Sequence, residues 1–293
     1  MHILRAQKSD TNKEIALRKF FETKGSASLI NCENVMQALD IIHKITTEFE
    51  GDNEISSLWR IMDTYPNKYW NYPLYVFLHK YGKLNAENEF ELRKEKLDEF
   101  KILLKETVRY FFLKGVIRQG GSNSVKEAVY KVYSKIESND NYLNEYRNNI
   151  SKSDQSEFGV LLEENRIGRY NRGLVLIAAY LNPRQDMREF AQLLSGEEKY
   201  HIEHILPQAW NDYDGWNKDT HKEDVNLLGN LMPLSQSLNI KASNEFFTRK
   251  KEKYKESSVQ DALDLIHIPN WTRDRLLERN SEKIELLREF FSN

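Results

Sequence analysis

The stretch Tyr200-His201-Ile202-Glu203-His204-Ile205-Leu206-Pro207-Gln208 concentrates more acid–base chemistry than any other part of this 293-residue chain. Two histidines and a carboxylate fall within four residues, between two β-prone apolar positions, and a proline stops the run. The segment Leu228-Gly229-Asn230-Leu231-Met232-Pro233-Leu234 follows, and then Asn239 and Lys241. The order is a strand, a loop, a second strand and a helix, with polar groups on each element. Residues 200–241 are therefore the candidate functional centre.

The composition is that of a soluble globular protein, with 40% hydrophobic and 30% charged residues. The net charge of −2 provides no overall basic field, so a nucleic-acid partner would need a local basic patch. Cys32 is the single cysteine, which excludes an internal disulfide and a zinc site built from cysteines. We find neither a signal peptide at residues 1–5 nor an apolar run of the ~18 residues that span a membrane. We therefore expect a cytoplasmic protein with no membrane segment.

Most of the first 185 residues carry helical periodicity. Helices are predicted over residues 11–21, 34–49, 87–113 and 173–181, and an aromatic cluster over 59–77 is typical of packing between helices. Short strands are predicted over 199–206 and 227–234. We expect a mainly α protein, with a helical domain over residues 1–185 and a second domain over 186–293 that carries a small ββα motif.

Two helices are predicted after the second strand from their first residues. Ser243 is a candidate N-cap for a helix over residues 244–255. Thr272 is a candidate N-cap for the last helix, over residues 273–291, with Trp271 as an apolar contact before it.

The residue types at 200–241 suit hydrolysis of a phosphodiester with one metal ion. A neutral histidine can take a proton from water near pH 7, and His204 is the candidate. A hard cation such as Mg²⁺ needs only one or two protein oxygens, which Glu203 and Asn239 can supply. Asn230 can orient the imidazole.

These residues resemble a known motif. The segments Glu203–Gln208, Gly229–Leu234 and Asn239–Lys241 are similar to the HNH, or ββα-metal, endonuclease motif. More closely, residues 199–258 resemble the H-x-x-P nuclease region at the C-terminus of GmrSD-type modification-dependent (type IV) restriction enzymes. Further matches are Trp210, residues 246–251 and 254–257, Trp271 and Arg279.

The resemblance implies roles for individual residues. His204 matches the general base, and Asn230 matches the asparagine that holds the loop and the base. Glu203 and Asn239 match the ligands of a divalent cation, Mg²⁺ or Mn²⁺. Phosphate contacts are expected from the residues His201, Lys241, Lys250 and Lys251, with His201 in a supporting role only.

Two departures from the family pattern are visible. Glu203 stands where aspartate is more usual, which lengthens the ligand by one methylene. The Asp-Gly-Gln-Gln-Arg-like motif of the family's nucleotide-binding domain does not occur in this sequence. We therefore expect either a C-terminal fragment or a member without that domain, which a separate nucleotide-binding restriction domain or subunit could complement.

The expected function is cleavage of DNA by an HNH-type endonuclease in restriction of foreign or modified DNA, a form of antiviral defence. Two alternatives stay open: a DNA-binding or protein-interaction module whose nuclease centre is inactive or activated by a partner, and a zinc hydrolase using His201, His204 and His221. One geometric question also stays open. Neighbouring side chains on a regular strand face opposite sides, so Glu203 and His204 can share one phosphate only if the chain bends near Leu206 and Pro207.

Overall fold

A computed structural model describes residues 3, 6, 19, 22, 36, 38–40, 52–87, 90–119, 123–213 and 215–292. It contains 65% helix and 7% strand, which confirms the predicted mainly α class. The helices predicted over 11–21 and 34–49 lie mostly outside the described residues. Within the described part of the chain, no helix combines the length and apolar character needed to cross a bilayer.

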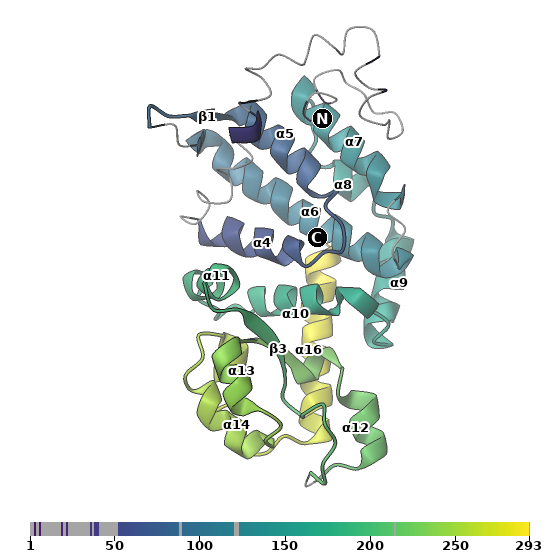
Figure 1. Ribbon diagram of the computed structural model, residues 1–293. Coiled ribbons are helices and arrows are strands. Elements are labelled where there is room, and N and C mark those ends of the chain that lie inside the picture. The colour runs from purple at the N-terminus through teal and green to yellow at the C-terminus, as the bar shows by residue number, and fades with distance from the viewer. Residues whose placement is uncertain are drawn as a thin grey trace. The chain divides into compact units, whose positions relative to one another are not determined.

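The chain forms two compact units, and the first comprises residues 1–55 and 66–151. Its described elements are α5 (Asn71–Tyr81), β1 (Gly82–Leu84), β2 (Phe90–Leu92), η3 (Lys94–Lys96), α6 (Leu97–Arg118), α7 (Asn123–Ser138) and α8 (Glu145–Asn148), labelled in part in Figure 1. Aromatic rings fill its core: Phe77 lies 5.3 Å from Phe100, and Tyr110 stacks on Tyr146 at 4.8 Å. Trp70 and Phe77 are fully buried, as a packing role for the aromatic cluster predicts.

The helix predicted over 87–113 begins later than expected. Residues 90–92 form β2, which pairs antiparallel with β1, and α6 begins at Leu97. Phe90 explains the difference, because its ring is 1% exposed and packs directly over Gly82. Burial of one large ring against the neighbouring strand outweighs the helical propensity of the Glu- and Lys-rich residues around it.

The second unit comprises residues 56–65 and 152–293. Its elements are the larger part of α4 (Asn53–Asp63), α9 (Lys152–Glu163), η4 (Gly168–Tyr170), α10 (Asn171–Tyr180), α11 (Met187–Ser195), β3 (Tyr200–His204), α12 (Lys218–Asp224), η5 (Leu228–Asn230), β4 (Leu231–Ser235), α13 (Gln236–Ala242), α14 (Phe247–Tyr254), α15 (Gln260–Leu263) and α16 (Arg273–Ser292). Contacts therefore group residues 152–185 with those that follow, whereas the boundary predicted at 185/186 stays a prediction.

A pair of strands and a helix occupy the middle of the second unit. β3 and β4 pair antiparallel, with Tyr200 opposite Ser235 and His204 opposite Leu231. α13 begins directly after β4, contacts β3 and packs against α14 (Figure 1). The predicted order of strand, loop, strand and helix is present, and α12 lies within the loop.

The two helix starts predicted near the C-terminus have different outcomes. Thr272 Oγ1 accepts a hydrogen bond from Arg275 N at 3.4 Å, and α16 begins at Arg273 as predicted. The prediction for Ser243 was wrong: this residue ends α13 with φ of 48°, and α14 begins only at Phe247. Asn239 consequently lies on a short helix of its own, directly after β4.

Gly229 is required by close packing. A Cβ atom at this position would lie 2.4 Å from Leu276 O and 2.6 Å from Asn280 N, both backbone atoms of α16. Only a residue without a side chain allows η5 to approach the helix this closely.

We expect Gly229→Ala to lower the free energy of unfolding by about 1–3 kcal/mol, because backbone must move to admit the methyl group. Chemical denaturation measures the change. Gly159→Ala is the matched control: it lies within α9, and its nearest neighbour is the movable side chain of Arg288 at 3.0 Å. The control should be neutral or slightly stabilising, and equal effects of the two substitutions would contradict the packing explanation.

Candidate active site

Glu203 and His204 are neighbours on β3 whose side chains have partners in different places. Glu203 lies opposite Met232 in the strand pair and is 3% exposed, whereas His204 lies opposite Leu231 and is half-buried. The hydrogen-bond partners of the Glu203 carboxylate come from α13 and α14, and the partner of the His204 imidazole is Asn226, in the loop before β4. This is the alternation of a regular strand.

Three side chains of the described residues donate to the carboxylate of Glu203. Lys250 Nζ and Tyr254 Oη donate to Oε1 at 2.7 and 2.8 Å, and Asn239 Nδ2 donates to Oε2 at 2.8 Å. Lys250 and Tyr254 are one turn apart on α14, so they reach the same oxygen from one face of the helix. Burial raises the pKa of the Glu203 carboxyl, and the Lys250 ammonium and the Tyr254 hydroxyl oppose this rise.

Lys250 is buried, whereas the predicted contact with phosphate requires an exposed ammonium group. Its side chain is 1% exposed, and Nζ donates both to Glu203 Oε1 and to His204 O, the latter at 2.6 Å. An ammonium enclosed by a carboxylate and a carbonyl cannot reach a phosphate at the surface without leaving both. In the described geometry, Lys250 instead fixes Glu203 and the backbone at His204.

Among the residues that the structure describes, the imidazole of His204 makes one side-chain hydrogen bond. Nε2 lies 3.2 Å from Asn226 Oδ1. Burial lowers the pKa of His204 below its ordinary value of 6.5, the nearby Lys250 ammonium adds to the decrease, and the Asn226 contact opposes it. Burial thus favours the neutral form of the ring, the form that a general base requires.

Asn230 is fully buried and uses both atoms of its amide. Oδ1 accepts from Leu206 N at 2.7 Å and from Trp271 Nε1 at 3.2 Å. Nδ2 donates to Leu206 O at 2.9 Å and to Val225 O at 2.8 Å. Asn230 thus joins the end of β3, the loop before η5 and the start of α16, but its amide bonds to the backbone after His204 and not to the imidazole.

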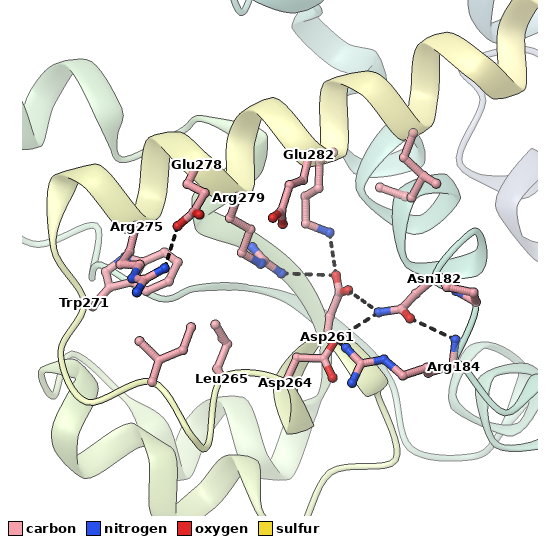
Figure 2. Close-up of a pocket in the computed structure, with 15 residues that line it drawn as sticks. Asn182, Arg184, Asp261, Asp264, Leu265, Trp271, Arg275, Glu278, Arg279 and Glu282 are labelled. Carbon is pink, nitrogen blue, oxygen red and sulfur yellow. Dashed lines mark hydrogen bonds and ion pairs between the residues drawn. The ribbon is translucent and has the colours of Figure 1, made fainter.

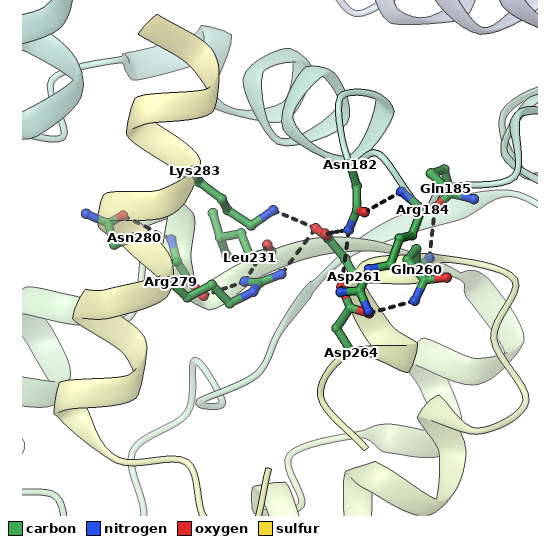
Figure 3. A network of polar contacts seen from close by, with 11 residues as sticks. Asn182, Arg184, Gln185, Leu231, Gln260, Asp261, Asp264, Arg279, Asn280 and Lys283 are labelled. Carbon is green, nitrogen blue, oxygen red and sulfur yellow. Dashed lines mark hydrogen bonds and ion pairs between the residues drawn. The ribbon is translucent and has the colours of Figure 1, made fainter. Parts of the chain in front are cut away.

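Residues of α16 support the backbone on both sides of Asn230. Asn280 Oδ1 accepts from Gly229 N at 3.0 Å, and Arg279 donates to Gly229 O and to Leu231 O. Figure 3 shows Arg279 reaching Asp261 as well, at 3.1 Å. The segment around Asn230, from the end of η5 to the first residue of β4, is therefore anchored to a long helix through backbone atoms.

Asp261 is the centre of this anchor. It accepts from Lys283, Arg279 and Asn182 at 2.5, 3.1 and 3.1 Å (Figure 3). Burial alone would raise the pKa of Asp261, but Lys283 and Arg279 outweigh burial and lower it. Burial lowers the pKa of Lys283 to about 8.

A hollow of about 420 Å³ borders the Asp261 cluster (Figure 2). Charged groups on its walls pair with one another, Arg275 with Glu278 at 2.7 Å and Arg184 with Asp264 at 2.8 Å. Most of the charged side chains that line this hollow thus form ion pairs with one another, and we propose no binding or catalytic role for it.

The other predicted phosphate contacts differ in how accessible they are. Lys241 is 55% exposed and lies 3.6 Å from Glu256, a surface ion pair of the weak kind. Lys251 Nζ donates to the carbonyls of Ile268 and Pro269 at 2.8 and 3.4 Å. His201 is half-buried on β3, opposite Leu234. Lys241 is therefore the lysine of this group that is best placed to meet a phosphate.

A second hollow, of about 320 Å³, brings the predicted catalytic residues together. Glu203, His204 and Asn239 all line it, together with Lys250, Ile240, Pro207 and neighbouring residues of the β3 and α13 ends. Asn230 does not line it and lies in the core next to it. Base, carboxylate and helix asparagine thus share one opening.

The residues around this hollow fit a hard divalent cation better than zinc. A carboxylate and an amide side by side offer oxygen ligands, and Mg²⁺ keeps waters for its remaining positions. For both to bind one ion, the Asn239 amide must turn its oxygen, in place of Nδ2, toward the ion. His221 Nε2 lies 2.7 Å from Pro207 O, and the described residues hold no cluster of three His, Cys, Asp or Glu side chains suited to a metal. The zinc hydrolase alternative therefore has no structural support.

The comparison with protein families gives a match over most of the second unit. The model of the GmrSD restriction endonucleases, C-terminal domain, matches residues 133–285. This chain belongs to that family. The matched span includes β3, β4, the hollow and most of α16, and the predicted resemblance to the C-terminal region of GmrSD restriction endonucleases is confirmed. No curated protein matches the chain significantly.

The structure of this GmrSD family member places two residues at the site to which sequence reasoning gave no role: Asn226 contacts the imidazole, and Tyr254 donates to the carboxylate. Lys250, predicted as a phosphate contact, binds the same carboxylate. The spacing of four between Lys250 and Tyr254 on a predicted helix was a usable signal for a shared face. Asn226 gave no such signal, because it lies in a loop 22 residues after His204.

We expect His204 to titrate below 6.5 in the folded protein, because burial disfavours the imidazolium. NMR titration of histidine-labelled protein measures this, with His204→Gln identifying the signal. As the pH falls below 6.5, His204 binds a proton more readily in the unfolded chain than in the folded chain. The free energy of unfolding therefore decreases as the pH falls below 6.5. A measured pKa above 6.5 would contradict the prediction.

Proposed function

We propose that this chain is a metal-dependent DNA endonuclease of the HNH type that acts in restriction of foreign or modified DNA. Membership of a restriction endonuclease family gives the class of enzyme. The observation that carries the finer proposal is that Glu203, His204 and Asn239 line one hollow, where two antiparallel strands meet a helix.

In the proposed reaction, neutral His204 takes a proton from a water molecule that attacks the phosphorus of the phosphodiester. The bond between phosphorus and the 3′ oxygen breaks, the departing oxygen takes up a proton from solvent, and the products are a 5′-phosphate and a 3′-hydroxyl. Glu203 and Asn239 would hold a divalent cation, which supplies positive charge to the phosphate and to the departing oxygen. Lys250 and Tyr254 keep the Glu203 carboxylate in place.

One observation favours a second candidate function, a DNA-binding or protein-interaction module with a silent or partner-activated centre. The Lys250 ammonium already neutralises the Glu203 carboxylate, at 2.7 Å. A cation on Oε2 of the same carboxylate must tolerate this neighbouring positive charge. Metal binding and cleavage therefore need direct measurement, with and without a nucleotide-binding restriction partner.

We expect the chain to cut plasmid DNA with Mg²⁺ or Mn²⁺, and His204→Ala to lower the cleavage rate by about 10²–10⁴, the usual contribution of a general base. Gel analysis of supercoiled plasmid measures the rate. Asn244→Ala is the matched control, since Asn244 lines the same hollow but is assigned no role. Cleavage that survives His204→Ala would overturn the mechanism, and DNA binding without cleavage under any divalent cation would favour the binding module.

We expect Lys241→Ala to weaken DNA binding similarly for all sequences and to lower the slope of log K against log salt by about 1, as loss of one phosphate contact does. Titration of fluorescent duplex DNA at several salt concentrations measures this. Lys251→Ala should leave the salt slope unchanged and lower thermal stability instead, because its ammonium holds two carbonyls. Equal salt slopes for wild type and Lys241→Ala would remove Lys241 from the proposed interface.

A further inference from the structure

We infer that Asn226 is the positioning residue of the proposed general base and that it determines which nitrogen of His204 carries the proton. This inference rests on the proposed nuclease function and assigns a residue to which neither the motif nor the family match gives a role.

The first observation is the chemistry of the contact between the two side chains. Oδ1 of Asn226 is a carbonyl oxygen and can only accept, so the 3.2 Å contact requires a hydrogen on His204 Nε2. A neutral imidazole carries one hydrogen in total. The lone pair is therefore on Nδ1, which makes no hydrogen bond within the described part of the chain. His204 lines the hollow with Glu203 and Asn239, so Nδ1 is the nitrogen available to take a proton from water.

The second observation is that the backbone around Asn226 is fixed. Asn165 Nδ2 donates to Asn226 O at 3.3 Å, and Leu227 N donates to Asp224 O at 3.0 Å. Val225 O accepts from the buried amide of Asn230 at 2.8 Å. The position of the Asn226 side chain is thus determined by the loop that carries it.

The third observation connects Asn226 with Asn230. The Asn230 amide binds Val225, next to Asn226, and also binds Leu206, two residues after His204. One buried side chain therefore sets the spacing between the segment with the base and the segment with its acceptor. Asn230 therefore acts on the imidazole indirectly, through the position of Asn226. This explains how Asn230 can support the base without touching it.

An isosteric pair of substitutions tests the inference. Asn226→Leu keeps the shape of the side chain and removes the acceptor, whereas Asn226→Asp keeps an acceptor. Long-range ¹H–¹⁵N correlation spectra of histidine-labelled protein, recorded where His204 is neutral, report the tautomer directly. His204→Gln identifies the signals, and Asn244→Leu, in the same hollow, is the control.

We expect wild type, Asn226→Asp and Asn244→Leu to show His204 with hydrogen on Nε2, and Asn226→Leu to show a mixture of tautomers. In plasmid cleavage, Asn226→Leu should lower kcat by about 10–100-fold with KM for DNA within about two-fold, as loss of an orienting hydrogen bond does. Asn226 is exposed, so folding of both variants is expected, and circular dichroism checks it.

The outcomes separate this inference from the nuclease proposal. A wild-type tautomer with hydrogen on Nδ1, or an Asn226→Leu spectrum identical to wild type, overturns the role of Asn226 whatever the cleavage assay shows. If the tautomer responds as expected but the wild type cuts no DNA with any divalent cation, the nuclease proposal fails and the assignment of Asn226 to the imidazole stands.

Discussion

The hydrogen bonds of the Asn230 amide are the interaction on which the rest of the site depends. A buried amide that lost these partners would cost on the order of 1–3 kcal/mol for each unsatisfied group, so the three segments that supply them are held together. Three of the four bonds go to backbone atoms, at Leu206 and Val225. The spacing of the site therefore depends little on which side chains occupy the loop between them, and that loop can carry a helix such as α12 without moving the base.

The carboxylate of Glu203 presents the opposite physical situation. A buried charge pair such as Glu203 and Lys250 gives up hydration, and replacing such pairs by apolar residues is often neutral or stabilising. We therefore expect the cluster to contribute little to the free energy of unfolding. Its main effect is to hold a carboxylate at the edge of a hollow, because two donors on α14 bind Oε1 while Asn239 binds Oε2.

The sequence predicted the order of the elements better than the contacts of individual side chains. Short β-prone runs followed by turn residues located β3 and β4, and an N-cap pattern located α16, since these signals depend on neighbouring residues alone. Lys250 was misplaced because a run of Arg and Lys reads as a solvated face, and only the packing of α14 on β3 shows which lysine points inward. Ser243 was predicted as an N-cap because serine is a favoured residue type at that position. Its backbone instead has a positive φ of 48°, which the sequence does not indicate. The contact from Asn226 depends on a loop conformation that Asn230 imposes from a distance.

Because side chains alternate along β3, the proposed metal ligand Glu203 and the proposed base His204 form hydrogen bonds with different elements. The carboxylate is held by α13 and α14, whereas the imidazole contacts Asn226 in the loop before η5. Lys250 connects the two residues, because it binds the Glu203 carboxylate and the backbone carbonyl of His204. The chain bends at Ile205 and Leu206, directly after β3, and Glu203 and His204 both line one hollow. Adjacent positions on one strand thus allow metal ligation and proton transfer to be adjusted through different neighbours, while Lys250 limits how far the two groups can move apart.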